Sequence, residues 1–392
     1  MRYSSLVFLV LMVMACGSDD ADNGVQQSAA VSYVSPIDYD IQLAGNFGEP
    51  RPWHFHGGLD IKTDNQEGKR IGSVADGYVS RITCNRYGFG NAIYVNHPDG
   101  HTSVYCHLKR FADEYERDLK LNHRDTLDLR FPADRYPVRA GQLIAYSGNT
   151  GHSTGPHLHL ELHDTETWQL LDPLEFIGQY VADTVAPVAH SFMAVPVKGE
   201  GEFNGGSGKQ TFGFGLGDVR QQHIRHHVDR TFTAWGRVGF ALWADDYAQG
   251  VYNHYGIRHT QLLVDGKEVF RADVHGIPVS CNPEVNLWGD YDHWRHHRTW
   301  YLKSYREQGM RLPIVHTGFD RGIVVFDEER PYRLTYVLRD YQGNESQFAF
   351  TVRGVRNKHI TINKRKKLWN DYLYWQQCLW PLCTLRPAPT LS

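Results

Sequence analysis

Short runs of alternating apolar and polar residues, separated by turn-forming residues, constrain the fold of this chain more than any other feature. Three such runs follow one another at residues 77–83, 91–96 and 101–106. Pro98-Asp99-Gly100 separates the last two runs and is a typical turn sequence. Because side chains alternate between the two faces of a strand, the pattern predicts a β-meander of half-buried antiparallel strands.

The same pattern of short alternating runs and turns continues through a Gly- and His-rich block, which we place at residues 37–182. Residues 138–146 and 156–162 have strand character, and Gly148-Asn149-Thr150-Gly151 is a turn between them. Residues 109–135 are charged, with scattered Leu and Phe, so we expect an insertion there. We therefore interpret 37–182 as one antiparallel β-sheet domain.

A second β-rich region is predicted at residues 187–355, after a boundary marked by Pro187. Residues 332–339 and 347–352 alternate around a turn at 340–344 and predict a hairpin. Further strands are expected at 235–244 and 259–269. The pattern favours an immunoglobulin-like β-sandwich, although no Cys-Trp-Cys signature accompanies it. The chain is therefore expected to be dominated by β-structure, with a tail at 356–392 for which the sequence predicts no structure.

Composition excludes several classes of protein. The 392 residues include 41 Lys and Arg against 44 Asp and Glu, which argues against a general nucleic-acid binder. Hydrophobic residues make up 41% of the chain, enough for a core, so global disorder is excluded. The 22 histidines are a first indication of metal or proton chemistry.

The N-terminus has the pattern of an export signal. An apolar run at residues 6–15 is too short to span a bilayer as a helix and fits a signal peptide at 1–15. Val13-Met14-Ala15-Cys16 resembles a bacterial lipobox, which implies a lipid on Cys16 and a membrane anchor. The polar segment 16–36 is then a tether, and its Ser18-Asp19-Asp20 run resembles the surface-export signal of some Gram-negative lipoproteins. We expect an outer-membrane lipoprotein of the cell envelope that faces the periplasm or the surface.

The remaining cysteines do not form a complete disulfide framework. If Cys16 carries lipid, five are left, and an odd number cannot all pair. Cys84 and Cys106 are candidates for a disulfide, because they end two neighbouring predicted strands, but the sequence leaves this open.

Three short motifs in the first block carry potential chemistry. His56-Gly-Gly-Leu-Asp60 has the form H-x-x-x-D, and His157-Leu158-His159 places two imidazoles on one strand face. His107 ends a predicted strand in Tyr105-Cys-His-Leu108. One carboxylate and two histidines make a three-ligand zinc site with an open position, as in catalytic sites. Two further histidines remain for proton transfer.

These motifs resemble those of the lysostaphin-like, or LytM-type, zinc metallopeptidases. The resemblance covers about residues 42–177, and its motifs agree in order and spacing. The matching segments are 55–61, 76–79, 87–91, 97–100, 105–108, 141–145, 148–151 and 155–161. The insertion at about 109–135 is a departure from the shortest members of the family and puts the shape of the substrate groove in doubt.

The resemblance implies a role for each site residue. His56, Asp60 and His159 would bind one zinc ion per chain, and His107 and His157 would be catalytic. The implied function is a zinc endopeptidase that cleaves cross-links or stem peptides of peptidoglycan. The alternative is an envelope lipoprotein that binds peptidoglycan or activates another hydrolase without cutting.

Other polar residues near the motifs leave alternatives open. One of His107 and His157 would take a proton from water and the other would stabilise the oxyanion, in an order the sequence does not decide. Glu161 is either a partner that orients an imidazole or a surface carboxylate. His54 and His152 are interpreted as bystanders or groove-lining groups. A further histidine cluster is expected in a solvated loop: His293, His296 and His297.

Lipid attachment at Cys16 can be tested by fractionation. Cys16→Ser should release the protein into the soluble fraction or leave its signal uncleaved, because the variant lacks the thiol that would carry the lipid. Stable anchoring needs more than one acyl chain, and none would then be attached at residue 16. The measurement is a comparison of membrane and soluble fractions by immunoblot. A normally processed variant that still sediments with membranes would show that another element anchors the chain.

Overall fold

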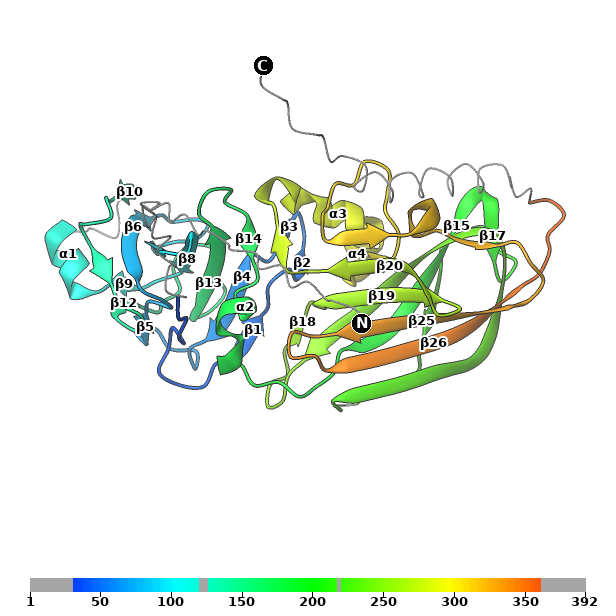
Figure 1. Cartoon of the computed structure of the whole chain (residues 1–392), viewed down its shortest axis with the longest axis horizontal. Coiled ribbons are helices and arrows are strands. Elements are labelled where there is room, and N and C mark those ends of the chain that lie inside the picture. Colours follow the sequence, from blue (N-terminus) through cyan, green and yellow to red (C-terminus); the bar gives the residue numbers. More distant parts are fainter. Residues whose placement is uncertain (1–30, 120–125, 217–219, 361–392) are drawn as a thin grey trace, which may run out of the picture. The chain divides into compact units, whose positions relative to one another are not determined.

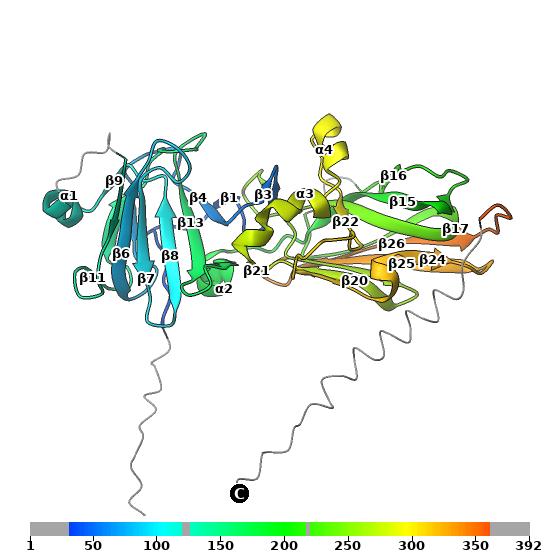
Figure 2. The same ribbon diagram turned by 90° about the horizontal axis from the view of Figure 1, so that it is seen from above.

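The alternating runs between residues 77 and 106 form neighbouring antiparallel strands of one sheet in the computed structural model (Figure 1). This first sheet has ten strands, and all its pairings are antiparallel. In spatial order its main path is β1 (Leu43–Gly45), β4 (Gly58–Lys62), β13 (His157–Asp164), β8 (His101–Cys106), β7 (Ala92–Asn96), β6 (Gly77–Cys84) and β10 (Leu127–Arg130). Three short strands extend it: β11 (Pro137–Val138) on β6, β14 (Leu170–Leu171) on β13, and β21 (Gly276–Ile277) on β14. Figure 2 shows β6, β7, β8 and β13 side by side.

The structure describes residues 31–119, 126–216 and 220–360. The predicted signal peptide, Cys16, the tether up to residue 30, insertion residues 120–125 and tail residues 361–392 lie outside the described residues.

Smaller elements complete the first block. A three-stranded sheet contains β5 (Arg70–Gly72), β12 (Leu143–Tyr146) and β9 (Arg110–Phe111), and a two-stranded sheet contains β2 (Pro50–Arg51) and β3 (His54–Phe55). The helices are α1 (Asp113–Leu119), α2 (Leu174–Ile177) and the 3₁₀ turn η1 (Gly178–Tyr180). The continuous strand expected at 138–146 is wrong, because Gly141 adopts a φ of 76° and turns the chain between β11 and β12.

The second region is built on an eleven-stranded sheet. Its main path is β16 (Gln210–Gly213), β15 (Val188–Phe203), β17 (His223–Tyr247), β26 (Glu345–Gly354), β25 (Pro331–Arg339), β19 (His259–Val264), β20 (Lys267–Asp273) and β23 (Val315–Thr317). The strands β18 (His254–Tyr255), β22 (Leu302–Lys303) and β24 (Val324–Phe326) pair with β17. Its helical elements are η2 (Val279–Glu284), α3 (Val285–Trp288), α4 (Tyr291–His297) and η3 (Phe319–Gly322). The described chain is therefore dominated by strands, while the immunoglobulin-like sandwich stays a prediction.

Strand lengths in this region differ in part from expectation. The expected strand 235–244 is the interior of the much longer β17, and β25 and β26 form the predicted hairpin. The single strand expected at 259–269 is wrong, because Asp265 and Gly266 both have positive φ and turn the chain between β19 and β20.

Two other expectations concern side chains. His293, His296 and His297 lie on helix α4, not in a loop, because Asp290 caps the helix by accepting a hydrogen bond from the His293 amide. Cys84 and Cys106 are both buried, and the possible disulfide between them is not formed.

The two regions share hydrophobic packing. The described residues of both regions belong to one compact unit. Phe55 and Leu170 of the first block belong to the same buried cluster as Ile277 and Trp288 of the second region. Pairing of β14 with β21 adds backbone hydrogen bonds at this junction. Within the described ranges, no helix is both long and apolar enough to cross a membrane.

The aromatic core of the second sheet should dominate its stability. Phe350 is fully buried and stacks on Phe192 with ring centroids 4.1 Å apart. Phe350→Ala should lower the free energy of unfolding by about 3–5 kcal/mol, because it leaves a cavity among aromatic rings. Urea denaturation measures the loss, and Val355→Ala, at a 45% exposed position, is the matched control with an expected change below about 0.5 kcal/mol. Equal losses in the two variants would contradict the packing argument.

Candidate metal centre

The register of three neighbouring strands brings the histidine motifs together. His159 on β13 lies opposite Asp60 on β4 and opposite Cys106 on β8. His56 shortly precedes β4, and His107 directly follows Cys106. Residues from three distant parts of the sequence therefore meet around His159.

Alternation along β13 gives it one polar and one apolar face. Leu158, Leu160 and Leu162 are fully buried in the core of the first block. The intervening residues His157, His159, Glu161 and His163 point to the opposite face. The leucines thus hold the strand in place while the polar face carries the chemistry.

Three side-chain atoms of the predicted metal site converge. The His56 Nε2 lies 3.1 Å from Asp60 Oδ1 and 3.0 Å from His159 Nδ1, and His159 Nδ1 lies 2.8 Å from Asp60 Oδ1. Ligands at 2.0–2.1 Å from a tetrahedral zinc ion are about 3.3 Å from each other. The triangle of two nitrogens and one oxygen therefore has nearly the size that a small cation at its centre requires.

The outer nitrogens of both imidazoles have acceptors of their own. His56 Nδ1 lies 2.6 Å from the Asn46 carbonyl oxygen, and His159 Nε2 lies 3.0 Å from Glu161 Oε1. If each outer nitrogen donates its proton to that acceptor, the inner nitrogens carry lone pairs. Two lone pairs and a carboxylate oxygen would then face one another, an arrangement that a bound cation stabilises. The donor set fits zinc.

Glu161 is a buried partner of the metal centre, which decides between its two predicted roles. Its carboxylate is 5% exposed, and its Oε2 accepts a hydrogen bond from His163 Nε2 at 2.7 Å. His163 in turn stacks on Trp168 with ring centroids 4.2 Å apart. The Glu161 carboxylate thus orients His159 from behind and is not a surface group.

Two glycines of the H-x-x-x-D motif make room for this arrangement. A Cβ at Gly57 would lie 2.4 Å from Glu161 Oε1, and one at Gly58 would lie 2.0 Å from the Leu160 carbonyl oxygen. Any larger residue at either position would displace β4 from β13 or Glu161 from His159. The close approach explains why glycines follow His56.

The electrostatic environment keeps the Asp60 carboxylate ionised. Burial favours its protonated form, but the neighbouring His56 and hydrogen bonds with His157 and His159 hold its pKa far below the ordinary range. Arg51 donates a hydrogen bond to Asp60 Oδ2 at 2.9 Å. Burial lowers the pKa of His56 to about 4, so this imidazole is neutral at pH 7. A neutral imidazole and an ionised carboxylate are the forms that bind metal.

The two predicted catalytic histidines face each other beside the metal triangle. The ring centroids of His107 and His157 lie 4.9 Å apart, and those of His107 and His159 lie 5.7 Å apart. His107 Nδ1 lies 2.8 Å from the Thr150 carbonyl oxygen, and His157 Nδ1 lies 2.8 Å from that of Gly155. In the tautomer in which Nδ1 donates to its carbonyl, Nε2 of each ring carries the lone pair that can accept a proton.

His107 sits in a strained backbone conformation. Its φ is 59°, which residues other than glycine seldom adopt, and it directly follows strand β8. Such strain concentrates at functional sites, where the surrounding structure holds the residue in place. Burial also lowers the pKa of His107 to about 4, so the ring is neutral at pH 7.

An open groove of about 1220 Å³ contains all five residues. His54 and His152 line it, in agreement with the groove-lining alternative. Val279 and Asn282, from the second region, also line it. The wall of the groove is therefore formed by both regions of the chain.

Several residues of the centre were missed by the sequence analysis. His163 could have been found, because it continues the alternating polar face of β13. Asn46 and Arg51 carry no local signal, since they reach the site through tertiary contacts with His56 and Asp60.

Removal of the ligand Asp60 should weaken metal binding more than a change of Glu161, which only contacts the ligand His159. Asp60→Ala should lose almost all bound zinc, because one of three ligands is gone. Glu161→Gln should weaken zinc binding about 10- to 100-fold, because the amide is a poorer acceptor for the His159 N–H. Competition with a chromogenic chelator measures both affinities. Glu166→Gln, at an exposed position, is the control, and a Glu161→Gln affinity equal to that of this control would exclude the orienting role.

The matched sequence family is consistent with this geometry. The model of Peptidase family M23 matches residues 54–173, a segment that includes all five site residues. The DD-carboxypeptidase/endopeptidase Mpg of Neisseria meningitidis is 29% identical over 36% of this chain and 29% of its own length. The peptidoglycan DD-endopeptidase ShyC of Vibrio cholerae is 31% identical over 32% of this chain and 25% of its own length. The chain thus spans less than a third of these curated relatives.

Among solved structures, the catalytic domain of lysostaphin from Staphylococcus simulans is 24% identical over 35% of this chain and 91% of that chain, with a TM-score of 0.26. The family match and the sequence relatives together support a peptidase M23 domain of the LytM and lysostaphin type at residues 54–173.

Proposed function

We propose that the chain is a zinc-dependent endopeptidase that cleaves peptide cross-links or stem peptides of peptidoglycan. The observation that carries the proposal is the convergence of His56, Asp60 and His159 beside the His107–His157 pair. A site that only binds peptidoglycan would need the groove but not two proton-accepting imidazoles next to three metal ligands. The M23 match at residues 54–173 supports a peptidase.

The residues of the site have complementary roles in this reaction. Zinc, when bound by His56, Asp60 and His159, supplies a Lewis acid that polarises the scissile carbonyl and lowers the pKa of water to about 7. One imidazole of the His107–His157 pair accepts the proton of the attacking water at Nε2. The other, in the tautomer that carries its proton on Nε2, donates a hydrogen bond to the developing oxyanion, and the proton taken from water then passes to the leaving amine.

The groove suits an extended peptide. It is open, and it offers both polar side chains and exposed aromatic surface, such as Phe89 and Tyr252. Peptidoglycan peptides are the substrates named for the ShyC relative. We propose direct D-alanyl–diaminopimelate cross-links as the bond cleaved, because the N-terminal pattern resembles that of Gram-negative lipoproteins.

We further propose that the protein acts in the cell envelope, anchored to the outer membrane by a lipid on Cys16. The proposal rests on the lipobox-like Val13–Cys16 sequence. Peptidoglycan lies in the same compartment, so the location and the substrate agree.

Catalysis should depend on His107 and His157, whereas metal binding should not. His107→Ala and His157→Ala should keep about one zinc per chain and lose about 10²- to 10⁴-fold in turnover, the usual cost of removing a proton-transfer group. Mass spectrometry of muropeptides released from purified cell walls measures turnover, and metal analysis measures zinc.

The control for this experiment is His316→Ala, at an exposed position on β23, which should retain normal rates. Near-normal rates in both site variants would remove the two histidines from the mechanism. No zinc-dependent release of peptides by the unaltered protein would favour the non-catalytic peptidoglycan-binding alternative.

A further inference from the structure

Three aspartates, two from the second region and one from the segment that leads into it, converge outside the M23 centre. Asp183 precedes β15, Asp246 lies near the end of β17, and Asp340 directly follows β25. One carboxylate oxygen from each of these side chains lies within 4.8 Å of the others. Three negative groups from distant segments of the chain are thus held at one point.

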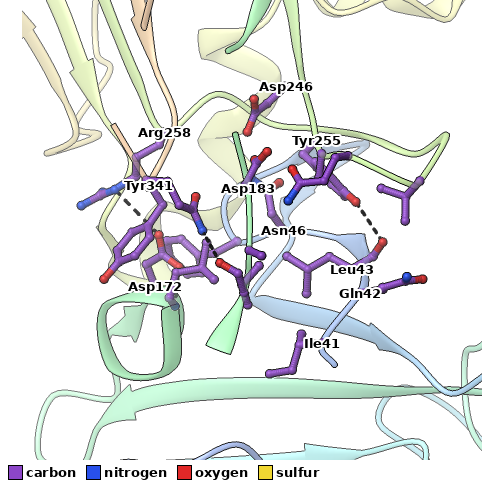
Figure 3. Close-up of a pocket in the computed structure, with 18 residues that line it drawn as sticks. Ile41, Gln42, Leu43, Asn46, Asp172, Asp183, Asp246, Tyr255, Arg258 and Tyr341 are labelled. Carbon is purple, nitrogen blue, oxygen red and sulfur yellow. Dashed lines mark hydrogen bonds and ion pairs between the residues drawn. The ribbon is translucent and has the colours of Figure 1, made fainter. Parts of the chain in front are cut away.

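A second observation that points to a ligand is the buried and unpartnered carboxylate oxygen of Asp246. The residue is only 6% exposed, and its Oδ1 atom is buried without a hydrogen-bond partner. A buried carboxylate oxygen without a partner carries a large desolvation cost. Figure 3 shows the Asp246 and Asp183 side chains next to each other at a cavity of about 60 Å³.

The Asp340 carboxylate is already oriented by its own turn. Its Oδ1 accepts a hydrogen bond from the Asn344 backbone N–H at 2.9 Å, and its Oδ2 accepts one from Asn344 Nδ2 at 2.5 Å. The same Asn344 amide donates to the Asp183 carbonyl oxygen at 3.3 Å. Gly343 permits the turn with a φ of 86°. The Asp340 carboxylate is therefore held in place by local structure before any ligand arrives.

The charges that act on the cluster are acidic. The groups acting electrostatically on Asp246 are Asp340, Asp183 and Asp245, and together with burial they raise its pKa well above the ordinary value. Burial likewise raises the pKa of Asp183 to about 7.

Arg258, which lines the same cavity (Figure 3), does not neutralise these groups. Its guanidinium forms ion pairs with Glu175 and Asp273 at 2.7 and 3.3 Å. Among the described residues, no ion pair joins a basic side chain to Asp183, Asp246 or Asp340, so their like charges are not offset by a direct cationic partner there.

We propose that Asp183, Asp246 and Asp340 form a binding site for a calcium ion. All the side-chain donors are oxygens, which are the ligands of hard cations, whereas the nitrogen-rich M23 centre suits zinc. Calcium accepts six to eight oxygen ligands in flexible geometry, so backbone carbonyls and water can complete the shell around three carboxylates. Magnesium demands a stricter octahedron and releases water reluctantly.

A cation at this site would connect three segments of the chain close to the contact between the second region and the first block. The neighbouring cavity is lined by Asp183 and Asp246 and also by Leu43 and Asn46 of the first block. Tyr255, opposite Asp246 in the β17–β18 pairing, donates a hydrogen bond to the Leu43 carbonyl oxygen at 3.0 Å. Calcium should therefore stabilise the fold without contacting the peptidase groove.

Thermal unfolding of the full protein in chelating-resin-treated buffer with constant micromolar zinc tests the proposal. Calcium at about 100 times its Kd should raise the Tm by about 5 °C. Asp246→Asn and Asp340→Asn should lose this response. Asp246→Asn should also unfold at a higher temperature than the unaltered protein when calcium is absent, because a neutral amide replaces a buried, repelled carboxylate.

Asp292→Asn, at an exposed position on α4, is the matched control, because Asp292 neither belongs to the cluster nor lines the cavity. It should retain the full calcium response. Terbium, a luminescent substitute for calcium, gives a second readout: excitation of Tyr255 and Tyr341, which line the cavity, should sensitise it in the unaltered protein and not in Asp246→Asn.

Three results would overturn the proposal. One is the absence of both the calcium shift and terbium luminescence in the unaltered protein, as expected if the carboxylates only share a proton. Another is a calcium response that Asp246→Asn and Asp340→Asn retain. A response to magnesium but not to calcium would overturn the choice of cation.

Discussion

The hydrogen bonding of β13 between β4 and β8 is the constraint on which the rest of the metal centre depends. Strand side chains have a period of two, so a slip of one residue would turn His159 into the core and Leu160 into the groove. Burial of each leucine on the core face contributes about 1.5–3 kcal/mol. Burial of three leucines, Leu158, Leu160 and Leu162, therefore favours the register that keeps His159 opposite Asp60.

The segment that carries His56 is held from the second region as well as by the first sheet. The Phe55 backbone N–H donates to Asn282 Oδ1 at 2.6 Å, directly before the metal ligand. On the other side, the side chain of Asn46 bonds to the Gly256 backbone, while the Asn46 carbonyl accepts from His56 Nδ1. Unfolding or mutation of the second region would therefore shift His56 through the hydrogen bonds of Asn282 and Gly256. No residue of that region belongs to the metal triangle itself.

Much of the site was predictable because strand alternation is a local property. The pattern His157-Leu-His159-Leu-Glu161 specifies one polar face whatever the partner strands are, and the motif spacing of the resemblance selected the remaining residues. The breaks inside two expected strands were not predicted, because they depend on positive φ at Gly141 and at Asp265-Gly266, where apolar residues continue on both sides of the turn. Arg51 and Asn282 could not be predicted either, since their positions follow from contacts between segments far apart in the sequence.

Under the proposed function, we expect substrate selection to involve residues outside the segment that the family model matches. The family match ends at residue 173, yet Tyr252, Val279 and Asn282 line the same groove as the metal ligands. Tyr252 and Val279 are exposed, so their apolar surface is free to contact a substrate that lies along the groove. Under the proposed function, bond cleavage belongs to five residues inside the matched segment, whereas the groove wall built by the second region lies outside that segment. If the proposed function is correct, differences in preferred peptide between this protein and its relatives should be sought in residues 252–282 before the three proposed zinc ligands.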